Sequence, residues 1–313
     1  MGAEEETMQR FINVTLFCLV LSSPLLASEF QFSSFDIPGA QLTRPLAVNA
    51  SGQIVGLYRD ANNVSHGFLI NVRDLPTGRY TQIDVPGATF TNAANINARG
   101  DIVGRWVGSD GYSHAYVRRA DGQFTSFDPA VPCVVTRSQT VAHGINDTGD
   151  IVGRCFDSSG KELGFLLRHD GSFKILDYPG TRTTDAWMLN NREEIVGDYS
   201  DNSGFVHGYT WTEDGGFVTF DIPGSETSVR AITERGDIAG VYGSTRSHIH
   251  GYLLPKGDQM VTTVDYPGSV SLGNGTGGNF SINNSRLIVG GYIDVNGIEH
   301  GFAAIECPPS GCR

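Results

Sequence analysis

One short pattern recurs along the chain and constrains its fold more than any other feature. It is an apolar residue followed by Asp-x-Pro-Gly, and neighbouring copies are separated by 44 to 49 residues. The copies, the third of them degenerate, are centred on Asp36, Asp84, Asp128, Asp177, Asp221 and Asp265. A repeat of this length indicates an array of similar structural units.

Two further patterns recur once in each repeat, in register with the first. An Ile-Val/Ala-Gly pattern ends at Gly56, Gly104, Gly153, Gly197, Gly240 and Gly290. A His-Gly/Ala-Phe/Tyr pattern begins at His66, His114, His207, His250 and His300, and Leu163 occupies the remaining place. Because three patterns stay in register through six copies, we treat the chain as six versions of one unit.

Each unit is expected to contain four short strands. Segments rich in Ile, Val, Phe and Tyr alternate with turns rich in Gly, Asn and Asp, and no amphipathic helical period is present beyond the first 28 residues. Four-stranded repeats of this length are typical of β-propeller blades. The sequence therefore predicts an all-β fold in which residues 29–313 form a single six-bladed β-propeller, with four antiparallel strands per blade.

The two ends of the repeat array complement each other. A strand at 32–36 precedes the first complete unit, whereas the last unit ends on a strand at 300–305 without an outer strand. Pairing of these two segments would close the last blade and leave no free sheet edge. A linear solenoid is the alternative, and it would leave the first strand unpaired.

The N-terminal 28 residues have the features of a secretory signal peptide. Arg10 precedes an apolar run at 11–26, and Ala27 and Ser28 follow it. The run is short and interrupted by Ser and Pro, so we expect no membrane span in the mature chain. The predicted location is extracellular or periplasmic.

Export makes the cysteines interpretable. An oxidising compartment favours disulfides over metal sites. Cys133 with Cys155 and Cys307 with Cys312 are the expected pairs, although four cysteines allow three connectivities. The second pair would fasten a short C-terminal tail.

The charge balance narrows the choice of partners. The chain carries 22 Lys and Arg against 34 Asp and Glu, a net charge of −12. Proteins that read nucleic acid usually present a basic face, so we expect no nucleic-acid ligand. We expect a monomer whose partner is a carbohydrate or another extracellular surface ligand.

The motifs resemble those of the bacterial extracellular HAF-repeat family, which is named for a His-Ala-Phe tripeptide. The tripeptide stands here as His66-Gly67-Phe68, for example, and the resemblance covers roughly residues 32–305. It implies a secreted repeat protein without an established activity, so no catalytic residues are carried over. Leu163 departs from the pattern.

Residues that repeat in every unit are expected to be scaffold, and residues that vary at a fixed place are candidates for recognition. We expect the repeated Asp to accept turn amides or to pair with the repeated His. The variable positions lie three and five residues before the turn of each first strand, and directly after Ile-Val-Gly. Those expected to line one mouth of the central channel are His143, Asp185, Trp187, Arg230, Arg105, Arg154 and Asp198.

An aromatic side chain among Arg and carboxylates suits a sugar, through stacking and bidentate hydrogen bonds. The main prediction is therefore a non-catalytic module that binds carbohydrate or a surface ligand. The simpler interpretation is that these residues form ion pairs between blades.

Two other functions stay open. The first is a polysaccharide-active enzyme, either a glycoside hydrolase or a polysaccharide lyase, with Asp185, Asp198 and His143 as weak catalytic candidates. The second is a structural scaffold of the cell envelope. We expect neither a metal nor a cofactor, although the turns at Asp157, Asp201 and Asp294 leave weak calcium binding as a minor alternative.

Overall fold

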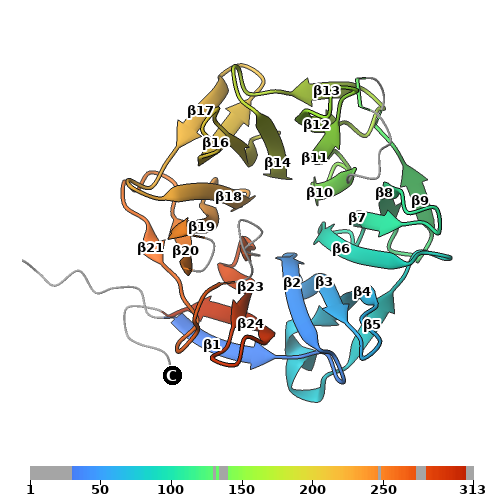
Figure 1. The fold of residues 1–313 in the computed structure, drawn as a ribbon. Helices are drawn as coiled ribbons and strands as arrows, with labels where there is room; N and C mark the ends of the chain where they lie inside the picture. Colours follow the sequence, from blue (N-terminus) through green and yellow to red (C-terminus); the bar gives the residue numbers. More distant parts are fainter. Residues whose placement is uncertain (1–29, 130–131, 134–139, 246–247, 273–279, 308–313) are drawn as a thin grey trace, which may run out of the picture.

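The computed structural model describes residues 30–129, 132–133, 140–245, 248–272 and 280–307. Its described elements are strands, apart from one 3-10 helix at Val72–Thr77. The all-β prediction is therefore confirmed. Figure 1 shows groups of strands arranged around a common centre, with β2, β6, β10, β14 and β18 nearest to it.

In each of the first three groups the four strands are consecutive along the chain. Group one contains β2 (Leu42–Val48), β3 (Gln53–Arg59), β4 (Ser65–Asn71) and β5 (Tyr80–Ile83). Group two contains β6 (Phe90–Ile96), β7 (Ile102–Val107), β8 (Ser113–Arg118) and β9 (Phe124–Phe127). Group three contains β10 (Val141–Ile145), β11 (Ile151–Phe156), β12 (Glu162–Leu167) and β13 (Phe173–Leu176).

Groups four and five also consist of four consecutive strands, whereas group six combines the last three strands with the first. Group four contains β14 (Thr183–Leu189), β15 (Ile195–Ser200), β16 (Val206–Thr212) and β17 (Gly216–Phe220). Group five contains β18 (Glu226–Ile232), β19 (Ile238–Thr245), β20 (His248–Leu254) and β21 (Thr262–Thr263). Group six combines β22 (Phe280–Ile282), β23 (Leu287–Ile293) and β24 (Glu299–Glu306) with β1 (Phe30–Phe35).

The first strand pairs with the last. β1 runs antiparallel to β24, with Phe32 opposite Ala304 and Phe35 opposite Gly301. His300 Nδ1 and Asp36 Oδ2 lie 2.8 Å apart beside this pairing. The predicted contact between the two ends of the repeat array is therefore present.

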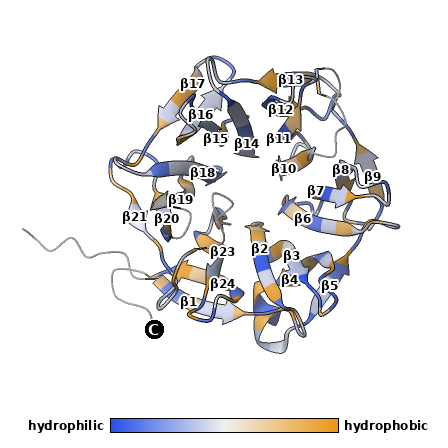
Figure 2. Cartoon of the chain, viewed as in Figure 1, coloured by the Kyte–Doolittle hydropathy of each residue, from blue (hydrophilic) through white to orange (hydrophobic). Residues whose placement is uncertain are grey.

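The apolar core lies between neighbouring groups. One buried cluster joins Ile54 and Phe68 of group one to Phe35, Val289 and Ala303 of group six. Group one therefore packs against group six. Figure 2 shows apolar and polar residues along the same strands. All five residues of β10 are buried, as expected when both faces of a sheet meet a neighbouring sheet.

Close packing inside each group explains the Gly of Ile-Val/Ala-Gly. A Cβ atom at Gly197 would lie 2.0 Å from the carbonyl oxygen of Asp185 and 2.7 Å from the ring of Tyr209. Neither backbone nor buried ring can move away cheaply, so only Gly fits. The aromatic residue of the third strand is buried over this Gly in groups one to five, as Phe68 is over Gly56.

The repeated His and Asp form a pair in five of the six groups, as the sequence predicts. His207 Nδ1 lies 2.9 Å from Asp221 Oδ2, for example, and the His ring stacks on Tyr199 of the second strand. Group three lacks this His. There Leu163 and Cys155 lie opposite each other in place of the His and the aromatic residue, and Lys161 Nζ binds Asp177 at 2.7 Å. The repeated Asp thus has a His or Lys nitrogen as its partner in every group.

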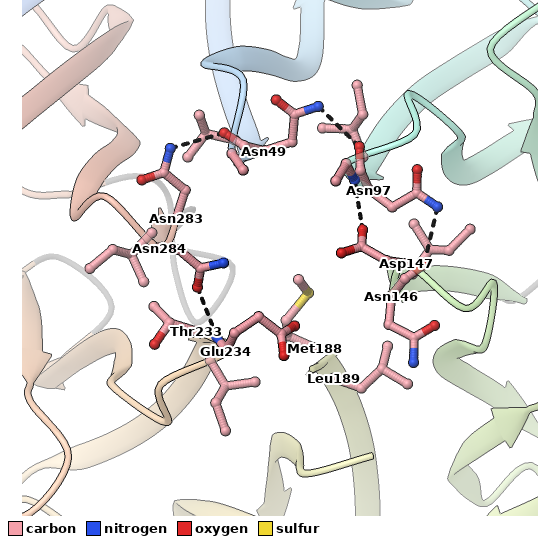
Figure 3. Close-up of a pocket in the computed structure, with 17 residues that line it drawn as sticks. Asn49, Asn97, Asn146, Asp147, Met188, Leu189, Thr233, Glu234, Asn283 and Asn284 are labelled. Carbon is pink, nitrogen blue, oxygen red and sulfur yellow. Dashed lines mark hydrogen bonds between the residues drawn. The ribbon is translucent and has the colours of Figure 1, made fainter. Parts of the chain in front are cut away.

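A ring of amides surrounds one end of the channel, around a cavity of about 70 Å³. Figure 3 shows Asn49, Asn97, Asn146 and Asn283 around it. Each Asn Nδ2 donates to the backbone carbonyl of the equivalent residue in the next group, and Asn283 donates to Asn49 at 2.9 Å. The Oδ1 atoms accept amides of their own turns, as Asn49 does from Gln53 at 3.0 Å. These side chains therefore link the groups as well as the turns.

The disulfide between Cys133 and Cys155 is present, as predicted. The second expected pair cannot be compared, because Cys312 lies outside the described residues, as do residues 1–28. In the part of the chain that the structure describes, no helix is long and apolar enough to cross a membrane.

Candidate functional site

A β-bulge in the innermost strand positions the variable side chains. The ladder between first and second strand skips one residue at Leu46, Ala94, His143, Trp187 and Arg230. These are the residues three positions before the turn that the sequence singled out. A bulge leaves its extra residue outside the ladder and redirects its side chain, here toward the channel.

The bulges open onto a cavity of about 290 Å³ at the channel mouth. Its lining includes five of the seven predicted residues, namely Arg105, His143, Arg154, Trp187 and Arg230. It also includes Arg44, Arg59, Phe90, Asn95 and Phe280, which were not singled out as ligand-binding residues. One signal for Arg44 and Phe280 was in the sequence, because they occupy the same variable positions.

Trp187 lies at the centre of a stack of polar and aromatic groups. The guanidinium of Arg230 lies 3.6 Å from the centre of the Trp187 ring, and the ring centre of His143 lies 3.9 Å away. Trp187 Nε1 donates to Asp198 Oδ2 at 2.8 Å. The indole is thus fixed in place from both faces and from its edge.

Asp185 and Asp198 stand behind the cavity wall instead of lining it, which corrects the prediction for both residues. Asp185 is 2% exposed, and its Oδ2 accepts a hydrogen bond from Arg154 at 3.2 Å. The Nε2 atom of His143 lies 3.3 Å from Asp185 Oδ1, without the alignment of a hydrogen bond. Asp185 and Asp198 are direct partners in the ladder between β14 and β15, and the side chains of Arg154 and Trp187, which line the cavity, donate hydrogen bonds to them.

The buried charges shift one another's pKa. Burial alone would raise the pKa of Asp185, but the charges of His143 and Arg154 outweigh it and lower this pKa. For Asp198 burial dominates over the attraction of Arg230, and the pKa is raised. Burial also lowers the pKa of His143, against the attraction of Asp185. The imidazole is therefore neutral at pH 7.

Glu162 is a further carboxylate behind the wall that sequence reasoning missed. Its Oε1 lies 3.6 Å from Arg154 Nη1. Burial and the charge of Asp185 raise the pKa of Glu162 to about 7, although Arg154 opposes them. Glu162 directly precedes Leu163, the position where group three departs from the repeat.

The turns considered for calcium use their carboxylates locally. Asp157 Oδ1 accepts the amides of Ser159 and Lys161, and Asp201 Oδ1 accepts those of Ser203 and Phe205. Among the described residues, no three His, Cys, Asp or Glu side chains are grouped so as to hold a metal ion.

No protein-family model matches the chain, and no curated protein matches it in sequence. Solved structures do resemble it. A putative TolB from Agrobacterium tumefaciens is 12% identical, with 90% of this chain and 99% of that chain covered and a TM-score of 0.60. A putative gluconolactonase is also 12% identical, with 88% and 92% covered and a TM-score of 0.54.

A mutant of the Aleuria aurantia lectin AAL, solved in complex with Fucalpha1-6GlcNAc, is 10% identical, with 84% of this chain and 93% of that chain covered and a TM-score of 0.51. At such low identities these likenesses bear on the fold alone. The chain has the fold of β-propeller proteins.

Proposed function

We propose that the six strand groups are the blades of a closed propeller, exported from the cell in the manner of HAF-repeat proteins. Pairing of β1 with β24 and the amide of Asn283 both join the last group to the first. The disulfide between Cys133 and Cys155 supports export, because such bonds persist in oxidising compartments.

We further propose that this protein is a non-catalytic carbohydrate-binding module with its site in the cavity at the channel mouth. One observation carries the proposal: a cavity of about 290 Å³ in which aromatic rings and guanidinium groups from different strand groups converge. Aromatic faces suit the apolar face of a sugar ring, and Arg suits its oxygen substituents. The lectin of similar fold supports the idea that such a scaffold can hold a sugar.

The geometry speaks against a glycoside hydrolase. Such an enzyme needs two carboxyl groups that flank the substrate. Asp185 and Asp198 do not line the cavity, and both are engaged by neighbouring side chains. A polysaccharide lyase is the second candidate, because His143 lines the cavity and is held neutral by burial, as a general base must be.

The test is binding of a polysaccharide panel to the full chain, followed by titration calorimetry on oligosaccharides of the best ligand. Trp187→Leu is expected to weaken binding at least tenfold, because the indole that holds the Arg230 guanidinium and the His143 ring in the cavity wall is lost. Val295→Ser, at a position that is 82% exposed, is the matched control and should bind as the unmodified protein does. Circular dichroism confirms that both variants fold.

Two results would contradict the proposal. Either no carbohydrate of the panel binds, or Trp187→Leu binds as tightly as Val295→Ser. An assay for unsaturated uronate on the same panel separates the alternatives: product formation that is lost in His143→Ala would establish the lyase instead.

A further inference from the structure

The cavity differs sharply in charge from the rest of the molecule. The chain has a net charge of −12, yet five Arg line the cavity and none of the described lining residues is Asp or Glu. A cationic concave site in an acidic protein concentrates anions locally. Which of these five guanidinium groups is available to a ligand decides what the site can recognise.

Three of the five Arg are already matched by carboxylates behind the wall. Arg44 Nε donates to Glu299 Oε1 at 2.7 Å, and Arg154 Nη1 donates to Asp185 Oδ2 at 3.2 Å. Arg230 Nη2 lies 3.7 Å from Asp198 Oδ2. These pairs belong to the protein's own framework, and their charges are largely compensated.

Arg105 and Arg59 are different. No carboxylate of the described residues lies within ion-pair distance of either guanidinium, and neither guanidinium takes part in a hydrogen bond there. The Arg105 guanidinium lies over the Phe90 ring, 4.4 Å from its centre. Burial and the nearby charge of Arg154 lower the pKa of Arg105 to about 10. An anion beside Arg105 would favour the charged form of its guanidinium and so raise this pKa again.

The strand register brings the two groups close together. Arg59 is the ladder partner of Ser65, and Ser65 is in turn the partner of Phe90 across the junction of groups one and two. Phe90 carries Arg105 on its face. Arg59, Ser65, Phe90 and Arg105 all line the same cavity, so the register places these two Arg on neighbouring strand groups of its wall.

We propose that the cavity selects sugars that carry an anionic group, and that Arg105 and Arg59 contact that group. This inference rests on the proposed function and names its ligand class. A guanidinium binds carboxylate in a bidentate manner, and the same fork accepts a sulfate ester. Phe90 beside it contacts the apolar face of the same sugar residue. A uronate unit combines both features in one residue.

The experiment compares oligosaccharides that differ only in charge. Titration calorimetry of the full chain uses oligogalacturonate and oligomannuronate, each against its methyl ester, and a sulfated galactan oligosaccharide against the desulfated one. We expect the ester or desulfated form to bind roughly ten- to a hundredfold more weakly, the effect of losing a charge-assisted hydrogen bond. Arg105→Gln should reduce this preference to less than threefold, and Arg105→Lys should retain part of it.

Arg73→Gln is the matched control. It removes the same charge from the chain, but Arg73 is 81% exposed and pairs with Asp74 outside the cavity. Its binding should equal that of the unmodified protein. A preference for the sulfated form that depends on Arg105 also supports the inference, and identifies the anion as sulfate.

The inference can fail separately from the proposed function. If acids and esters bind equally, and Trp187→Leu still weakens both, the cavity binds sugars without reading charge and the inference is wrong. If Arg105→Gln behaves like Arg73→Gln toward the acids, Arg105 does not contact the anion. If no oligosaccharide binds at all, the proposed function itself fails.

Discussion

Replacing Asp185 by Asn is expected to destabilise the fold more than the same change at its ladder partner Asp198. Asp185 is 2% exposed, and its carboxylate lies 3.2 Å from the Arg154 guanidinium and 3.3 Å from the His143 ring. Removing one member of a buried ion pair leaves the other uncompensated, which costs about 3–5 kcal/mol. In a domain of this size that loss lowers Tm by roughly 6–20 °C.

Asp198 provides the matched comparison. Folding raises its pKa, so the native environment already favours the neutral form over the charged one. Its Oδ2 accepts hydrogen bonds from Trp187 Nε1 and Ser228 Oγ, and the Oδ1 of Asn can accept both. Asp198→Asn also removes the negative charge 3.7 Å from Arg230 Nη2, a longer separation than that between Asp185 and Arg154. It should therefore lower the free energy of unfolding by about 1–3 kcal/mol, less than Asp185→Asn does.

The assay is urea unfolding of the full chain at pH 7 and at several lower pH values. Because folding lowers the pKa of Asp185, the stability from its charge is present above the unfolded value and is lost as the pH falls through the folded one. Asp185→Asn should flatten this acid-side loss. Equal destabilisation by both substitutions at pH 7 would refute the assignment of the buried charges.

Three further changes probe other features. Folding raises the pKa of Glu162 to about 7, so the free energy of unfolding falls as the pH rises from about 4.3 toward that value. Glu162→Gln should remove this fall. Thermal melts of both proteins at pH 5 and pH 8 measure it. Joint replacement of Cys133 and Cys155 by Ala opens a loop of sequence separation 22 and should lower the free energy of unfolding by about 3 kcal/mol, measured in urea; no loss would contradict the loop-closure argument. Gly197→Ala forces a Cβ to within 2.0 Å of a carbonyl oxygen, so we expect a loss of at least about 3 kcal/mol or failure to fold, and normal melting would contradict the close approach.

The repeat made much of the fold predictable. Strand order within each group, the pairing of His with Asp, and the contact of β1 with β24 all follow from patterns that recur at fixed spacing. The ring of Asn side chains could not be predicted in the same way. Its Nδ2 atoms bond to the next group, whereas the sequence pattern reveals only the local turn.

For the candidate site the limit of sequence reasoning was geometric. The variable positions identified five residues that do line one cavity. Sequence could not show that Arg154 and Trp187 hold Asp185 and Asp198 behind the cavity wall, because these contacts depend on how the side chains pack. Nor could it show that Glu299 compensates Arg44 while Arg105 lacks such a partner among the described residues, since those relations join distant parts of the chain.

The pairing of β1 with β24 has a kinetic consequence. During synthesis β1 emerges first, yet its partner ends at Glu306 of a 313-residue chain. Phe30, Phe32 and Phe35 therefore lack their final neighbours until the chain has been made as far as Glu306. Contacts between such distant segments form slowly, and waiting apolar strands are prone to aggregate. Until β24 is available, β1 therefore exposes an unpaired apolar edge that favours aggregation of the nascent chain.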